Sequence, residues 1–133
     1  MLRIILLAAA ISIQTPATPT FRLICVESQH GECSNEFICQ KHLSKNTLLK
    51  ITLPEIVRIT EAQGTVQKCI LGSCGETTLV NARESKGGGW AVHRSPKDSI
   101  LIDGQTGFFT QATIINGPGG GVVGFAFGTC KRD

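Results

Sequence analysis

Apolar and polar residues alternate with a period of two through most of the chain after residue 20, as expected for β-strands that bury one face. We expect each apolar set to supply a buried face, and the clearest sets are Leu49, Ile51 and Leu53, then Val66 and Ile70, then Phe108 with its β-branched followers, and Val123, Phe125 and Phe127. The pattern predicts strands over residues 21–27, 36–40, 47–53, 65–71, 77–83, 90–94, 99–103, 108–115 and 122–129.

Glycine-containing segments between these strands predict turns. The segment Asp103–Gly107 separates two apolar runs, and its glycines allow the positive φ of a tight hairpin. Residues 87–89 and 116–121 should also reverse the chain. Residues 54–63 fit either a short helix, with Pro54 at its start and Gly64 after its end, or a strand; β-branched residues favour the strand slightly.

Short strands at regular spacing predict an all-β fold, a small antiparallel meander that forms a closed or nearly closed barrel of about eight strands. Closure would bring the first and last strands together and remove their exposed edges. Residues 18–133 have the length of a single domain.

The N-terminus has the features of a signal peptide over residues 1–17. Arg3 precedes an apolar run from Ile4 to Ile13, and small residues follow near Ala17. The apolar run is too short to cross a bilayer, and no later run approaches the required length of about 20 residues. We therefore expect a periplasmic or secreted protein with no membrane contact after the leader is cleaved.

Six cysteines in an exported chain of this size predict a disulfide-stapled domain. Cys25 and Cys130 fall on the first and last strands, where a bond would close the barrel. The short separations from Cys33 to Cys39 and from Cys69 to Cys74 suggest two local bonds. Six cysteines allow about 15 pairings, and the spacing alone leaves the others open.

The charge balance argues against nucleic acid as a partner. The formal net charge is +3, and only Arg3 among the basic residues would leave with the leader. Lys41, Lys45 and Lys50 lie close together but without interleaved aromatic residues, as on a solvated face.

A metal site is an alternative reading of the first cysteines. Cys25, His30, Cys33, Cys39 and His42 could supply thiolate and imidazole ligands to a zinc ion. Their spacing does not match a standard zinc finger, and an oxidising compartment would convert these thiols into disulfides. We therefore expect neither a metal nor another cofactor.

Three segments carry a resemblance to a group of known proteins: the early strand Phe21–Cys25, the hairpin Ile102–Phe108 and the closing Gly128–Cys130. Together with the leader they look like the small secreted or periplasmic β-proteins of proteobacteria, which are largely uncharacterised. The resemblance implies an exported β-fold and no particular activity.

The segment Ser85-Lys86-Gly87 resembles the short lysine-glycine element that small periplasmic lysozyme inhibitors insert into a lysozyme cleft. In that family the lysine can pair with catalytic carboxylates, which would give Lys86 this role here. The family also uses a tyrosine, and this chain contains no tyrosine. Inhibition of a lysozyme-like hydrolase is therefore an alternative function.

A non-enzymatic binding module is the function that the sequence favours, with an unknown protein or small molecule as its ligand. Loops on a rigid β-scaffold commonly carry the residues that bind a ligand, and the sequence shows no set of polar residues expected to converge on a catalytic site. Lys86 and Trp90 are the candidate binding residues, although core packing beside Ala91 and Val92 would equally explain the tryptophan.

Overall fold

The computed structural model describes residues 19–34, 36, 38–55, 61–85, 87–117 and 120–133, and the expected leader lies outside these ranges. Ten strands account for most of the described residues. They are β1 (Thr20–Cys33), β2 (Cys39–Leu43), β3 (Thr47–Pro54), β4 (Ala62–Ile70), β5 (Ser73–Cys74), β6 (Thr78–Glu84), β7 (Trp90–Ser95), β8 (Asp98–Ile102), β9 (Phe108–Gly117) and β10 (Gly120–Arg132). No helix occurs in these ranges.

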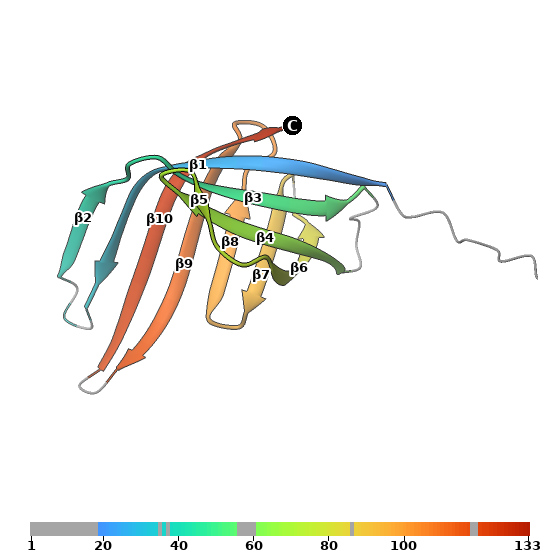
Figure 1. Ribbon diagram of the computed structural model, residues 1–133. Coiled ribbons are helices and arrows are strands. Elements are labelled where there is room, and N and C mark those ends of the chain that lie inside the picture. The colour runs from blue at the N-terminus through green and yellow to red at the C-terminus, as the bar shows by residue number, and fades with distance from the viewer. Residues whose placement is uncertain (1–18, 35, 37, 56–60, 86, 118–119) are drawn as a thin grey trace, which may run out of the picture.

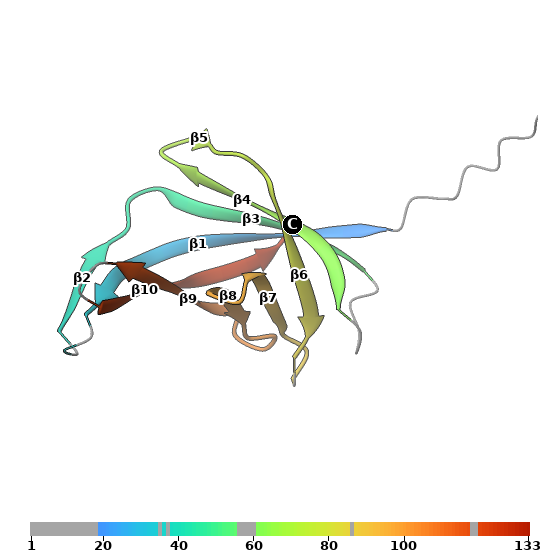
Figure 2. The same cartoon turned by 90° about the horizontal axis from the view of Figure 1, so that it is seen from below.

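Eight of the strands form a closed antiparallel barrel, as the sequence predicts. Around the barrel the order is β1, β3, β4, β6, β7, β8, β9 and β10, and β10 pairs with β1 to close it. Figure 2 shows the sheet curving round on itself in this order. The short strands β2 and β5 lie outside the ring, on the edges of β1 and β4.

Strand β1 is longer than predicted because a bulge lets it continue past Glu27. Its first part, to Val26, pairs with β3, and its second part, from Gln29 to Cys33, pairs with β2. The register with β10 shifts between Glu27 and Gln29, where one extra residue is accommodated. The strand predicted over residues 36–40 is correspondingly displaced to Cys39–Leu43, where it pairs with the far part of β1.

This arrangement produces a wall of sheet that projects beyond the rest of the barrel. Strand β2, the second part of β1 and the adjoining ends of β9 and β10 extend together past the ends of β7 and β8 (Figure 1).

The barrel interior holds one hydrophobic core. Alternate residues of each strand point inward, and the largest completely buried side chains are Phe109, Ile51, Leu53, Val92 and Cys25. Trp90 is partly buried against this core, with its ring centroid 5.5 Å from that of Phe21. Trp90 thus packs against the edge of the core and keeps part of its surface exposed.

The prediction that Val123, Phe125 and Phe127 form a buried face is wrong. The inward positions of β10 are instead taken by small residues, Gly124, Ala126, Gly128 and Cys130. Phe109 of the neighbouring strand occupies the space that they leave. A Cβ atom on Gly128 would lie 2.5 Å from the Phe109 ring. Small residues on one strand thus accommodate a large one on the next.

On β9, too, the buried face differs from the one that the sequence predicts. Phe109 is 1% exposed, whereas Phe108, which the sequence analysis placed on a buried face, is 60% exposed. Ile70, at the end of β4, is also half exposed, unlike Val66 of the same predicted set. The alternation of apolar residues located these strands correctly, but Phe108 and Ile70, which it predicts to be buried, are exposed.

Three disulfides join the pairs that the cysteine spacing suggests: Cys25 with Cys130, Cys33 with Cys39, and Cys69 with Cys74. Each bond links directly opposite residues of adjacent antiparallel strands. The first crosses the seam between β1 and β10, and the other two fasten β2 and β5 to the barrel. Three such bonds indicate an oxidising, extracellular type of environment. The described part of the chain contains no helix with the length and hydrophobicity needed to cross a membrane.

The hairpin predicted at Asp103–Gly107 joins β8 to β9. Gly107 has a φ of +75° and donates its N–H to the Asp103 carbonyl at 2.9 Å. The Asp103 carboxylate accepts hydrogen bonds from the side chain and backbone N–H of Thr106, which lower the pKa of Asp103 below its usual 3.8. In the ambiguous segment, Pro54 ends β3 and Ala62 begins β4, while residues 56–60 lie outside the described ranges.

Candidate functional site

The interior of the barrel changes from apolar at one end to polar at the other. Along β1 the inward series Phe21, Leu23 and Cys25 continues to Glu27. On β9, Phe109 is followed at inward positions by Gln111 and Thr113, and on β8 the inward Ile102 and Ile100 are followed by Asp98. The polar ends of these strands lie together, so this end of the barrel has the composition of a binding site rather than of a core.

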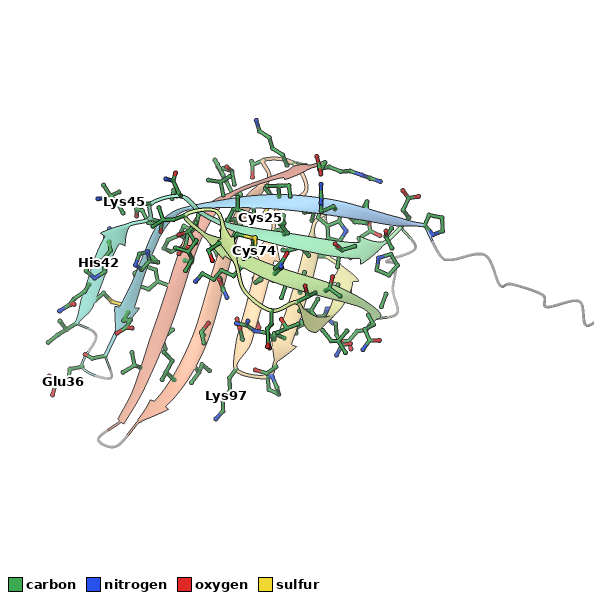
Figure 3. All side chains as sticks on the ribbon, in the orientation of Figure 1. Cys25, Glu36, His42, Lys45, Cys74 and Lys97 are labelled. Carbon is green, nitrogen blue, oxygen red and sulfur yellow. A yellow bond between two sulfur atoms is a disulfide. The ribbon has the colours of Figure 1, made fainter. Side chains whose placement is uncertain are left out.

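A hollow of about 830 Å³ opens at this polar end, with the projecting wall on one side. His42 marks that wall in Figure 3. The residues that line the hollow are Glu27, His30, Gly31, Glu32, Gln40, His42, Leu43, Lys45, Thr47, Lys68, Ile70, Leu71, Arg94, Gln111, Thr113, Ile115, Gly124, Phe125 and Ala126. The volume is in the range of small-molecule and peptide sites.

Asp98 anchors one side of the polar end. It is 5% exposed, and its Oδ2 accepts a hydrogen bond from Arg94 Nε at 2.7 Å and a second from the same guanidinium. Its Oδ1 accepts hydrogen bonds from Gln111 Nε2 at 3.1 Å and from Thr113 Oγ1 at 3.3 Å. This carboxylate is fully satisfied by the protein, and its role is to orient Arg94 beside the hollow.

Glu27 has far fewer partners, although it is buried to a similar extent. Its side chain is 7% exposed, and its one contact among the described residues is an ion-pair contact of 3.7 Å between Oε1 and His30 Nδ1. That distance is too long for a hydrogen bond. His30 Nδ1 lies closer to Ser44 Oγ, at 2.8 Å. No completely buried side-chain nitrogen or oxygen of the described residues lacks a hydrogen bond, so the Glu27 carboxylate reaches the open hollow, where it is an acceptor for water or for a ligand.

Positive charge comes from other strands around the hollow. Lys68 occupies the inward position after Val66 on β4, and Lys45 lies between β2 and β3. In the part of the chain that the structure describes, no carboxylate lies within ion-pair distance of either ammonium group. A smaller cavity of about 100 Å³ adjoins the hollow and shares Lys68, Arg94 and Gln111 with it. The site therefore combines an open acceptor on β1 with uncompensated cations on its other sides.

Of the two candidate binding residues chosen from the sequence, the structure describes only Trp90, and Trp90 does not line this hollow. Trp90 lies at the apolar end of the barrel against Phe21, and Lys86 lies outside the described residues. The sequence did contain a usable signal. Glu27 and Lys68 continue the inward parity of their strands, so a polar residue at that position implied a polar end to the interior.

The cysteines and histidines of the alternative metal site do not come together as zinc ligands. Its cysteines, Cys25, Cys33 and Cys39, are in disulfides, which removes the thiolates that a zinc ion would need. His30 and His42 are directly opposite on β1 and β2, with ring centroids 5.6 Å apart. Within the described ranges no three histidine, cysteine or carboxylate side chains are grouped closely enough to hold a metal ion.

Comparison with protein-family models, curated proteins and solved structures returned no match to this chain. The class of protein is therefore defined by the structure itself. It is a small antiparallel β-barrel, closed by a disulfide at the seam and open at one polar end.

Proposed function

We propose that the protein is an exported, non-enzymatic binding module that works in the periplasm or outside the cell and takes a polar ligand into the hollow. The observation that carries this proposal is Glu27. This carboxylate is largely buried, accepts no hydrogen bond from the described protein and reaches the solvent of the hollow, so its donors must come from there. A ligand with an N–H or ammonium group would take the place of water at Glu27.

The lining favours a ligand that carries charges of both signs. An ammonium or amide N–H would reach Glu27 on β1, and a carboxylate would meet Lys68 and Arg94 on β4 and β7. Ile70 and Ile115 contribute apolar surface to the same hollow. An amino acid or short peptide has this combination of groups.

All six cysteines are held in disulfides, which supports binding rather than thiol chemistry. The fixed barrel also supports binding, because a site on strands needs little ordering when a ligand enters.

The proposal is tested by isothermal titration of the oxidised protein with a panel of free amino acids and di- to tetrapeptides. Glu27→Gln should weaken binding of any ligand found by about 10- to 100-fold, the effect of losing a charged hydrogen-bond partner. Glu84→Gln, an exposed acid on β6 away from the hollow, is the matched control and should leave the affinity unchanged. Absence of binding across the panel, or equal affinities for the wild type and Glu27→Gln, would refute the proposal.

Inhibition of a lysozyme-like hydrolase through Ser85-Lys86-Gly87 remains the second proposal. It is supported by a tight turn between β6 and β7, in which Ser85 donates its N–H to the Gly89 carbonyl at 2.9 Å. Gly87 and Gly88 both have positive φ angles and are exposed. Lysozyme activity measured with the wild type and with Lys86→Ala tests it. Inhibition that the substitution abolishes supports this role, and lack of inhibition by the wild type removes it.

A further inference from the structure

The outer surface of the barrel carries a large apolar area over β1, β8, β9 and β10. Six side chains in it are between 40% and 60% exposed: Val26, Leu101, Phe108, Ile114, Val123 and Phe127. We call this set the outer apolar face. It lies on the opposite side of the sheet from the hollow, because its residues alternate with the inward-facing ones.

Strand pairing makes the outer apolar face continuous. Val26 and Phe108 both neighbour Thr129, one from each side of β10. Further along the same two strands, Val123 is directly opposite Ile114. Side chains at such cross-strand positions are within contact distance of one another.

The aromatic centre of the face is held in place by the sheet beneath it. The rings of Phe125 and Phe127 pack with centroids 5.3 Å apart. Phe125 lies over Gly31 of β1, where a Cβ atom would be 2.5 Å from the Phe125 ring. The absence of a side chain at Gly31 thus makes room for the Phe125 ring, which reaches the rim of the hollow and packs against Phe127 of the outer apolar face.

No charged residue interrupts this face. The outward positions between its apolar side chains are occupied by Ser99, Thr110, Ala112 and Thr129. Charged residues lie at its margin, among them Lys97 beside Ile114, Asp103 and Lys131. An uncharged face meets an identical face without electrostatic repulsion, which makes it suited to contact with its own copy.

The outer apolar face is comparable in area to the largest apolar patches on monomeric proteins. Its six named side chains expose on the order of 500 Å², which is at the upper end of the 300–600 Å² typical of the largest patch on a monomer. A stable interface needs about 800 Å² from each partner. The patch would form the apolar centre of such an interface, and Thr110, Ala112 and Thr129, which are exposed between its side chains, would be buried with it.

We propose that two copies of this chain pair through the outer apolar face, sheet against sheet, about a two-fold axis. Such a contact is isologous, so Phe108 and Phe127 of one copy meet the same surface of the other. The hollow stays accessible in the dimer, because Glu27 and His30 line the inner side of the projecting wall. This inference does not depend on what the hollow binds.

Sedimentation velocity of the oxidised, leader-free protein tests the proposal over about 1 to 100 µM, since dimerisation depends on concentration. The wild type should sediment as a dimer at the upper concentrations. Phe108→Glu replaces the most exposed side chain of the face with a charge and should raise the dissociation constant at least 100-fold, giving a monomer. Leu101→Glu provides a second variant at the edge of the same face and should act in the same direction.

Leu79→Glu is the matched control, because Leu79 is 63% exposed on β6, outside the outer apolar face. It should leave the dimer intact. Circular dichroism and the absence of free thiols verify that each variant is folded. The proposal is overturned if the wild type stays monomeric throughout, if both face variants remain dimeric, or if Leu79→Glu dissociates the protein as strongly as Phe108→Glu. Ligand titration of monomeric Phe108→Glu separates this outcome from the fate of the proposed binding site.

Discussion

Removal of the seam disulfide tests how much of the stability comes from closing the barrel covalently. Cys25 and Cys130 are directly opposite on β1 and β10, and their bond joins residues separated by 105 positions. Replacing both by alanine deletes the bond and leaves no unpaired thiol. The two sulfurs lie in the core, where alanine is tolerated without burying a polar group.

The expected loss follows from loop closure in the unfolded chain. For a loop of this length the chain-entropy relation gives about 4.8 kcal/mol at 25 °C. The bond between Cys69 and Cys74 spans only 5 positions, and the same relation gives about 2.1 kcal/mol. Cys69→Ala/Cys74→Ala is therefore the matched control, and the two double variants should differ by about 2.7 kcal/mol.

Urea unfolding without reductant measures both values. Trp90, the single tryptophan, packs against Phe21 and loses this environment on unfolding, so its emission reports the transition. The seam variant should have the lower midpoint by a wide margin. Equal midpoints for the two variants, or a larger loss from the local bond, would show that loop length does not determine the contribution of these disulfides.

Two other substitutions test the core and the β8–β9 hairpin. Phe109→Ala should destabilise the protein by about 3 to 5 kcal/mol in the same urea assay, because the Phe109 ring is buried against Gly128. Phe108→Ala, on the outer surface, should cost far less stability. Similar losses for the two variants would contradict the inward orientation of Phe109. Asp103→Asn removes a carboxylate whose pKa is lowered by Thr106, so above pH 3.8 the variant should melt at a lower temperature than the wild type. As the pH falls below 3.8 and the wild-type carboxylate protonates, this difference in melting temperature should close; a gap that is unchanged by pH would refute the role assigned to the charged hydrogen bonds.

Strand positions could be predicted from sequence better than strand faces. The run from Leu49 to Leu53 has one apolar set, so its alternation correctly identified the buried side. On β10 the apolar set is Val123, Phe125 and Phe127, and the buried set is made of small residues. Because the size of the neighbouring Phe109 decides which set fits inside, the assignment depends on a pairing that alternation within one strand does not contain.

The candidate binding site was harder to predict from the sequence than the strand faces. The first strand predicted from the sequence ends at Glu27. The bulge that follows allows β1 to continue, and the wall that it forms borders one side of the hollow. A bulge is set by pairing with β10, about a hundred residues later in the chain, so local sequence could not locate it.

The order of the cysteines along the chain has a consequence for biosynthesis. A growing polypeptide presents Cys25, Cys33 and Cys39 as three neighbouring thiols long before Cys130 exists, and native pairing requires the first of them to wait. Premature oxidation of Cys25 with Cys33 would have to be undone by exchange before the last strand could dock. Correct maturation therefore relies on the final segment of the chain, because a protein that lacks β10 leaves Cys25 without its native partner.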